Sequence, residues 1–295
     1  MILLTGVLFS LYACLPMEDP PEETIYLRKL NNLEALLNEN SGMTEFDGLI
    51  WFINDGGNDS AIYGYDRSNR TVERSVAIRN SSNVDWEDIT QNEEYLFIGD
   101  FGNNASGNRN DLKIYMISKS DLTSTADTVE QTGIIHFHYE DQADFSPVAN
   151  NTTPFDCEAF IATEDSIILF AKDWVNQQTR LYTLPLVAGN HVAKLRKQWN
   201  VNGLITSAAW SADDQVLYLL GYSEIAAPFL SVCSGFDADH LTYNEIRRTD
   251  FSSLMPTQAE GIAILSDGSV LISSEAFTQI SSLSKSPELF VVDYD

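Results

Sequence analysis

Short apolar runs recur along this chain, and five of them have nearly the same pattern of residues. Each run ends at one fixed position on a polar residue, which is acidic in four of the five. The runs are Trp51–Asp55, Leu96–Asp100, Leu169–Asp173, Tyr218–Tyr222 and Leu271–Glu275. Brief runs rich in Ile, Leu and Phe, bounded by turn residues, predict β-strands rather than helices.

A second pattern precedes each run at an almost constant spacing and opens another predicted strand. Its first residues are Ser41, Glu87, Glu158, Ser207 and Glu260. Self-similarity at a period of roughly 40–50 residues, all of it strand, is typical of a propeller. The sequence therefore predicts an all-β fold, a β-propeller of four-stranded blades.

The number of repeats predicts the number of blades. Four repeats each divide into four predicted strands, and the last, which begins near Glu260, has three. The missing strand has a donor at the other terminus, Thr24–Leu30, and pairing the two ends would close the ring and remove exposed sheet edges. Five blades are expected; six are the alternative if residues 141–154 contain a degenerate blade. Residues 24–295 then form a single propeller domain.

The amino-acid composition limits the classes of partner that the protein is expected to bind. The chain has 295 residues, 43 acidic against 17 basic, and a formal net charge of −26. Such a charge repels phosphate-bearing surfaces, so nucleic acid and anionic membranes are not expected partners. The simplest interpretation of the charge is solubility, and the alternative is that some carboxylates surround a divalent cation.

The first residues read as a targeting segment. Residues 1–14 form a signal peptide whose apolar run is too short for a permanent membrane helix. Its end, Leu11-Tyr-Ala-Cys14, resembles the lipobox of bacterial lipoproteins, which implies lipidation of Cys14. Residues 15–23 are an acidic, Pro-rich tether. We expect an exported lipoprotein that meets the membrane only through its lipid anchor, at the outer membrane or cell surface; a periplasmic or secreted protein is the alternative.

In a propeller the first strands line a central channel, so the recurring acids are expected to meet there. Carboxylates held close together need a counter-charge, a raised pKa or water. Calcium prefers about six to eight oxygen ligands and would suit them. Structural hydrogen bonding between blades is the competing explanation. The candidate channel and ligand-binding residues are Asp55, Glu87, Asp88, Asp100, Asn103, Glu158, Asp173, Glu260 and Glu275, of which Glu87, Glu158, Glu260 and Asp100 are the candidate metal ligands.

Other chemistry has weaker support in the sequence. The four histidines do not form an HExxH motif, and we find no GxSxG elbow, P-loop or dinucleotide fingerprint. Two further insertions, residues 103–111 and 141–154, are expected to form rim loops around the channel mouth. No catalytic residue can be assigned on this basis.

Several strings resemble secreted β-propeller proteins of Bacteroidetes, most of which have no assigned biochemical role. They are Asn54–Asn58, Asp85–Ile89, Tyr95–Asn104, Phe155–Ala159 and Gln258–Ile262. The Glu-Gly opening at Glu260 is more distantly similar to gluconolactonase and phytase-like propellers, whose central Glu, Asn and Asp residues bind calcium or another divalent metal. That resemblance implies Glu260 as a ligand, with Glu87 and Glu158 as helpers.

Two functions remain open from the sequence. The first is a binding or interaction module that takes a glycan, a peptide or a partner protein on its rim loops. The alternative is a calcium-dependent hydrolase of lactone or phosphoester type that uses the central channel. Fold alone does not decide between them.

Overall fold

The computed structural model describes residues 24–255, 257–280 and 283–295. The predicted signal peptide, Cys14 and the tether lie outside the described residues. Almost every described element is a strand, and the helical segments are single turns, such as α1 (Lys119–Leu122). None of the described helices has the length and apolar character needed to cross a membrane.

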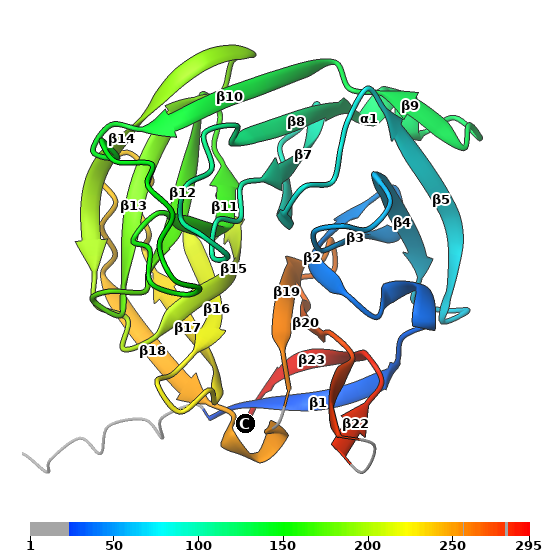
Figure 1. Cartoon of the computed structure of the whole chain (residues 1–295). Helices are drawn as coiled ribbons and strands as arrows, with labels where there is room; N and C mark the ends of the chain where they lie inside the picture. The colour runs from blue at the N-terminus through cyan, green and yellow to red at the C-terminus, as the bar shows by residue number, and fades with distance from the viewer. Residues whose placement is uncertain (1–23, 256, 281–282) are drawn as a thin grey trace, which may run out of the picture.

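Four main sheets surround a common axis (Figure 1). The first contains β2 (Asn40–Phe46), β3 (Leu49–Asn54), β4 (Ala61–Asp66), β5 (Thr71–Arg79) and the short β9 (Thr128–Glu130). Another contains β15 (Leu204–Ser211), β16 (Val216–Tyr222), β17 (Pro228–Ser234) and β18 (Glu245–Asp250). Within each sheet the long strands run antiparallel and follow chain order.

Two repeats are joined into one eight-stranded sheet. One half is β6 (Trp86–Gln91), β7 (Tyr95–Asp100), β8 (Lys113–Ser118) and β10 (Gly133–Tyr139). The other half is β11 (Asp156–Ala162), β12 (Ser166–Asp173), β13 (Gln178–Pro185) and β14 (Gly189–Trp199). The outermost strands β10 and β14 pair in parallel, which continues the ladder from one repeat to the next.

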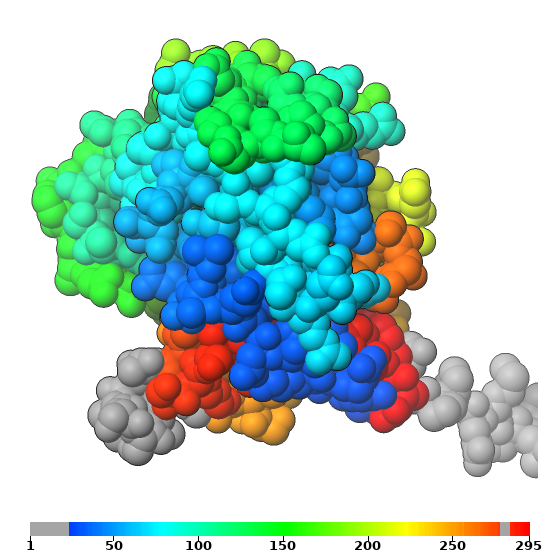
Figure 2. All heavy atoms as spheres, turned by 90° about the vertical axis from the view of Figure 1, so that its right-hand side faces the viewer, coloured from blue at the N-terminus to red at the C-terminus, as the bar shows by residue number. Residues whose placement is uncertain are grey.

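The two ends of the chain share the remaining main sheet. It contains β1 (Ile25–Asn32), β23 (Glu288–Tyr294), β20 (Val270–Ser274) and β19 (Ala259–Ile264). Strand β1 pairs antiparallel with β23, from Ile25 opposite Tyr294 to Asn32 opposite Glu288. Figure 2 shows these N-terminal and C-terminal segments side by side at the lower edge of the molecule. A separate hairpin, β21 (Phe277–Ile280) and β22 (Leu283–Lys285), follows β20.

The first strands of the repeats form the inner wall. Contacts run from β2 to β6, β11, β15, β19 and back to β2. Apolar side chains fill the space between neighbouring sheets: Trp51, Trp86 and Tyr115, for example, belong to one buried cluster that joins the first two repeats. Residues 141–154 contain no strand. The core therefore lies between sheets, and the polar residues of the first strands are left facing the axis.

Candidate functional site

Every first strand carries a β-bulge at the same place. The strand register slips by one residue at Ser41, Glu87, Glu158, Thr206 and Glu260. A bulge leaves one residue unpaired and re-aims its side chain. In the fourth repeat the bulged residue is Thr206. The sequence pattern predicted Ser207 at this place, so the prediction is displaced there by one residue.

The bulged residues have two different uses. Where the residue is not acidic, its hydroxyl links neighbouring blades: Ser41 Oγ donates to the Trp86 carbonyl at 3.0 Å, and Thr206 Oγ1 to the Ala259 carbonyl at 3.0 Å. Where the residue is glutamate, its side chain lines a pocket on the axis. Glu87, Glu158 and Glu260 converge there from the first strands of three different repeats.

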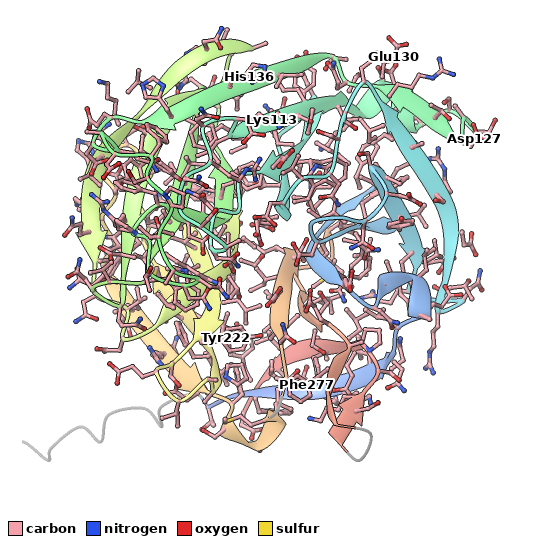
Figure 3. The ribbon with its side chains drawn as sticks, in the orientation of Figure 1. Lys113, Asp127, Glu130, His136, Tyr222 and Phe277 are labelled. Carbon is pink, nitrogen blue, oxygen red and sulfur yellow. The ribbon has the colours of Figure 1, made fainter. Side chains whose placement is uncertain are left out.

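This axial pocket has a volume of about 520 Å³. Acidic residues line it together with aromatic ones, and Figure 3 shows two of the lining residues, Tyr222 and Phe277, in the lower half of the molecule. Its polar and charged lining comprises Asp55, Glu87, Asn104, Asn151, Glu158, Lys172, Tyr222, Thr257, Gln258, Glu260 and Glu275, and its aromatic walls are Trp174 and Phe277. The pocket is thus mainly acidic, and Lys172 is the one cation among the described residues that line it.

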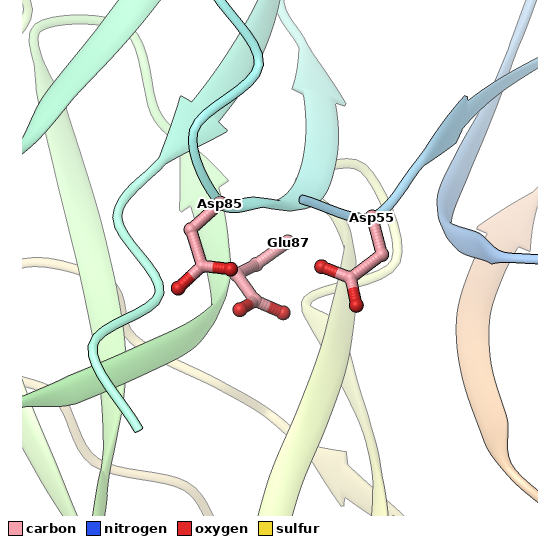
Figure 4. A group of neighbouring side chains, drawn as sticks. All are labelled: Asp55, Asp85 and Glu87. Atoms are coloured by element: carbon pink, nitrogen blue, oxygen red, sulfur yellow. The ribbon is translucent and has the colours of Figure 1, made fainter. Parts of the chain in front are cut away.

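Three carboxylates come closest together at one side of the pocket. Oxygen atoms of Asp55, Asp85 and Glu87 all lie within 4.8 Å of one another, and the three side chains point into the same space (Figure 4). Asp55 directly follows β3, while Asp85 and Glu87 flank the first residue of β6. The Gly102 backbone approaches closely: a Cβ there would lie 2.0 Å from Glu87 Oε1 and 2.5 Å from Asp85 Oδ2.

Glu87 is the most buried member of this cluster. Its side chain is 7% exposed, and among the described residues no group donates a hydrogen bond to its carboxylate. Burial raises the pKa of Glu87 well above its ordinary value, and the negative charges of Glu158 and Asp55 add a smaller contribution in the same direction. A buried carboxylate without donors is unfavourable as an anion unless a cation is present.

Neighbouring acids are shifted in the same direction. Burial and the nearby Asp55 carboxylate raise the pKa of Asp85 to about 7. Burial raises the pKa of Glu260 to about 7, although Lys172 opposes the change. Burial, together with Glu260, raises the pKa of Glu275 to about 10. At neutral pH Glu275 therefore holds its proton, while Asp85 and Glu260 lie near the midpoints of their titrations.

Lys172 compensates one of the acids directly. Its ammonium group pairs with the Glu158 carboxylate, both side chains being more than nine-tenths buried, and it also lies 5.4 Å from the Trp174 ring centroid. Glu158 with its partner is one compensated pair. The carboxylates around Glu87 have no such partner among the described residues.

Four predicted site residues instead form hydrogen bonds or ion pairs within the fold: Asp100, Asp173 and Asn103, described here, and Asp88, described below. Asp100 is fully buried and pairs with Arg109 at 2.8 Å and Lys113 at 3.1 Å, so the structure does not bring this candidate metal ligand to the pocket lining. Asp173 accepts the backbone N–H groups of residues 175 and 176 and caps their turn. Asn103 connects its loop to Asp156 and Phe155.

Asp88 joins three repeats. Its carboxylate accepts the Ile89 N–H at 2.9 Å, the Phe160 N–H at 3.3 Å and the Ser207 hydroxyl at 3.1 Å. Burial raises its pKa well above the ordinary value despite these donors. The side chain therefore acts as a hydrogen-bonded hub within the inner wall.

Sequence reasoning did not select Asp85, Asn104 and Asn151 for the site. Asp85 stands two residues before Glu87, as Asp156 does before Glu158, and this repeated Asp-x-Glu spacing was a usable signal. Asn104 and Asn151 come from the two insertions that were predicted to form rim loops. These insertions bond to each other through the Asn151 N–H and the Asn104 carbonyl at 2.9 Å.

No family model and no curated protein matches this chain. Solved structures do resemble it. A glucose dehydrogenase is 8% identical with a TM-score of 0.50 over 91% of this chain and 99% of its own. A DUF4221 protein of Bacteroides vulgatus is 11% identical with a TM-score of 0.40 over 92% and 98%, and the Swd1 β-propeller domain of Myceliophteria thermophila is 11% identical with a TM-score of 0.43 over 84% and 82%. At these identities the likeness concerns the fold alone. The neighbours are β-propellers, and so is this chain.

Proposed function

We propose that the protein is a calcium-dependent binding module whose axial pocket holds the cation and the partner's oxygen atoms. The observation that carries this proposal is the approach of the Asp55, Asp85 and Glu87 carboxylates to within 4.8 Å of one another. Oxygen ligands from carboxylates are those that calcium prefers. The charge of a divalent ion would stabilise the ionised forms that burial disfavours.

The surroundings of the cluster fit an ion rather than a hydrogen-bonded hub. Asp88 and Asp100 show what a structural acid looks like in this molecule, because donors or cations satisfy each of them. Glu87 has neither among the described residues. The absence of a side chain at Gly102 keeps space beside the Glu87 and Asp85 oxygens free.

With one oxygen from each, the three carboxylates supply three of the roughly six to eight oxygens that calcium takes. The remaining positions would accept hydroxyl or carboxylate oxygens from a glycan, a peptide or a partner protein. The pocket volume of about 520 Å³ lies within the usual size range of small-ligand sites. Asn104 and Asn151 stand in its lining as neutral hydrogen-bonding groups, and Trp174 offers an apolar face.

Calcium binding to the purified chain tests the proposal. Isothermal titration at neutral pH should show saturable binding, and thermal unfolding in EDTA should occur at a lower temperature than in calcium. Glu87→Gln keeps the size of the side chain and should weaken calcium binding by at least about tenfold. Glu224→Gln, at an exposed acid outside the three-carboxylate cluster, is the matched control and should bind normally. Unchanged unfolding in EDTA together with an absence of calcium binding would exclude a cation site.

A second candidate function is calcium-dependent hydrolysis of a lactone or phosphoester. One observation favours it: Glu260 lines the same pocket and its pKa is raised to about 7, which suits a general acid or base near neutral pH. The bound cation would polarise the substrate. Turnover of p-nitrophenyl phosphate or of gluconolactone that Glu260→Gln abolishes, with calcium binding retained, would favour the enzyme over the binding module.

We also infer that the ring has five blades and is closed by the N-terminal strand. The cyclic contacts of β2, β6, β11, β15 and β19 support this count. The pairing of β1 with β23 supports closure by the chain's two ends. In this description the eight-stranded sheet is two blades connected through β10 and β14.

Export with lipidation at Cys14 is part of the proposal. The apolar run that ends at Leu11-Tyr-Ala-Cys14 supports it, as does the acidic, Pro-rich composition of residues 15–23. Such an anchor would place the binding pocket at a bacterial surface. Radiolabelled palmitate should enter the expressed chain and should be absent from Cys14→Ser; equal labelling of both would refute lipidation at this residue.

A further inference from the structure

We propose that the propeller has a second binding surface, at the opposite end of its strands, which takes a basic peptide segment with apolar side chains. The surface is a groove of about 1000 Å³. It lies among four hairpin turns, whereas the acidic pocket lies at the other end of the same strands: in β11, Glu158 lines the acidic pocket and Ala162, at the end of the strand, lines the groove. Its lining is Gln91, Asn92, Glu93, Glu94, Tyr95, Met116, Ala162, Thr163, Glu164, Leu186, Val187, Ala188, Trp210 and Ala212.

The groove exposes apolar surface that the fold does not need to expose. Val187 is 61% exposed, and Ala188 and Ala212 are also exposed. Trp210 is half-buried, with its ring packed against Phe236 at a centroid distance of 5.0 Å, and presents its remaining surface to the groove. Aromatic and aliphatic side chains grouped in a concave site are typical of binding anchors.

The charged residues of the lining have one sign. Glu93, Glu94 and Glu164 are exposed, and none of them forms an ion pair with another described residue. The nearby Lys119 is already engaged, because its ammonium group donates to the Asn92 carbonyl and lies 4.9 Å from the Phe46 ring centroid. The charge of Glu93 also acts on Lys119, without an ion pair. Among the described residues, Glu94 and Glu164 are therefore the lining acids that offer uncompensated negative charge beside apolar surface.

A narrow depression, lined by both apolar and polar residues, continues the groove onto the axis. Its lining includes Ile89, Ile161 and Ile262, each from a different first strand. It shares Gln91, Ala162 and Trp210 with the groove. A peptide lying in the groove could thus place one small apolar side chain at the axis while its basic residues meet the glutamates of the turns.

The negative charge of the groove favours a basic peptide over the other possible occupants. Nucleic acid and anionic lipid would be repelled by the glutamates. A second copy of this chain is unfavourable, since each copy has a net charge of −26. The chain's own residues 15–23 contain four acids and no Lys or Arg, so they would be repelled as well. Electrostatic complementarity with a Lys- or Arg-bearing segment is the arrangement that remains.

The test uses the full chain and a short fluorescein-labelled peptide built from repeated Lys-Leu pairs. Fluorescence anisotropy should show binding with a Kd below about 1 mM. A peptide with Glu in place of Lys should not bind, and one with Ser in place of Leu should bind at least about tenfold more weakly. Equal binding of the Lys-Leu and Lys-Ser peptides would show that charge alone acts and would overturn the proposal.

Variants of the chain then locate the surface. Replacing Glu93, Glu94 and Glu164 together by Gln should weaken binding by at least about tenfold, because it removes the complementary charges. The matched control replaces Asp121, Asp127 and Glu130, three exposed acids of the outer edge, by their amides; Figure 3 shows two of them there. Equal weakening in both variants would overturn the proposal, since net charge alone would then explain binding.

Two further variants separate this surface from folding and from the axial pocket. Val187→Ser changes an exposed side chain, so it should fold normally and still weaken peptide binding by about threefold or more. Glu87→Gln should leave peptide binding unchanged even where it removes calcium binding. Peptide binding that is insensitive to Val187→Ser and to the triple glutamate change would overturn the proposal, whatever the outcome at the calcium site.

Discussion

At the scale of single residues, buried acids differ in how far their neighbours compensate their charge. Asp100 is fully buried yet paired with Arg109 and Lys113, so its charge is compensated within the fold. Glu87 is almost as buried and has no donor among the described residues. Burial alone therefore does not distinguish the proposed ligand Glu87 from the structural acid Asp100; the difference lies in their partners.

Removal of the Asp100 charge should affect stability rather than ligand binding. Asp100→Asn would leave Arg109 and Lys113 without their buried anion, and breaking a buried pair from one side costs about 3–5 kcal/mol of unfolding free energy. Urea denaturation followed by circular dichroism measures the loss. Calcium affinity of the folded fraction should equal that of the natural chain. If Asp100→Asn were stable and no longer bound calcium, Asp100 would have to be assigned as a metal ligand after all.

Glu275 gives a prediction about pH. Its pKa is raised to about 10, so between roughly pH 4.3, the ordinary value, and pH 10 the folded chain retains a proton that the unfolded chain has lost. The unfolding free energy should therefore fall as the pH rises through this window, by at most about 1.4 kcal/mol per pH unit for this one group.

Glu275→Gln mimics the protonated side chain and should remove that contribution. In EDTA, denaturant unfolding between pH 7 and pH 9 should show a shallower decline for Glu275→Gln than for the natural chain. Stability at pH 5, where both side chains are uncharged in the folded state, should differ little. Glu224→Gln, at an exposed acid, serves as the control, and parallel pH profiles for Glu275→Gln and the natural chain would contradict the assignment.

At the scale of elements, the bulge in each first strand explains both what the sequence predicted and where it fell short. The repeated register of apolar runs predicted the strands, because period and turn residues determine them locally. It also grouped Glu87, Glu158 and Glu260, which do line one pocket. A bulge is a property of two paired strands, so the one-residue displacement from Ser207 to Thr206 was not visible in one strand's sequence.

Partners distant in sequence account for the other differences. Asp100 is satisfied by Arg109 and Lys113, which come from an insertion and the next strand, and its place at the end of an apolar run resembles that of Asp55. Asp85 was not among the predicted site residues, because only the folded chain brings it to Asp55. Local pattern thus predicts elements well, and the composition of the site depends on contacts between them.

The bulge hydroxyls should contribute measurably to stability. Thr206→Val keeps the shape of the side chain but removes the donor to the Ala259 carbonyl, a buried group that would lose its bond across two blades. The expected loss of unfolding free energy is about 1–3 kcal/mol. Ser211→Ala, which removes an exposed hydroxyl–carboxylate contact at the end of the same strand, should cost less than about 0.5 kcal/mol. Equal effects of the two changes would argue against the interblade bond.

At the scale of the whole molecule, the pairing of β1 with β23 ties the beginning of the chain to its end. The pairing extends over the full length of both strands, and ion pairs of Arg28 with Asp293 and of Lys29 with Glu288 accompany it. These surface pairs contribute little individually. The larger contribution is the backbone ladder, which covers an edge of β23 that would otherwise be open to another chain.

A truncated chain that begins at Leu33, and so lacks β1, should therefore have a less stable ring. Without β1 the last sheet keeps β19, β20 and β23, and the edge of β23 is exposed. We expect cooperative unfolding at a lower denaturant concentration and concentration-dependent association through the open edge, measured by chemical denaturation and light scattering. Addition of a synthetic peptide of residues 24–32 should restore part of the stability, because it supplies the missing ladder in trans. A peptide of the same composition in scrambled order is the control. A truncated chain that remains monomeric and as stable as the natural one would mean that the ring does not need its terminal strand, and the inner wall alone would then have to hold the acidic pocket together.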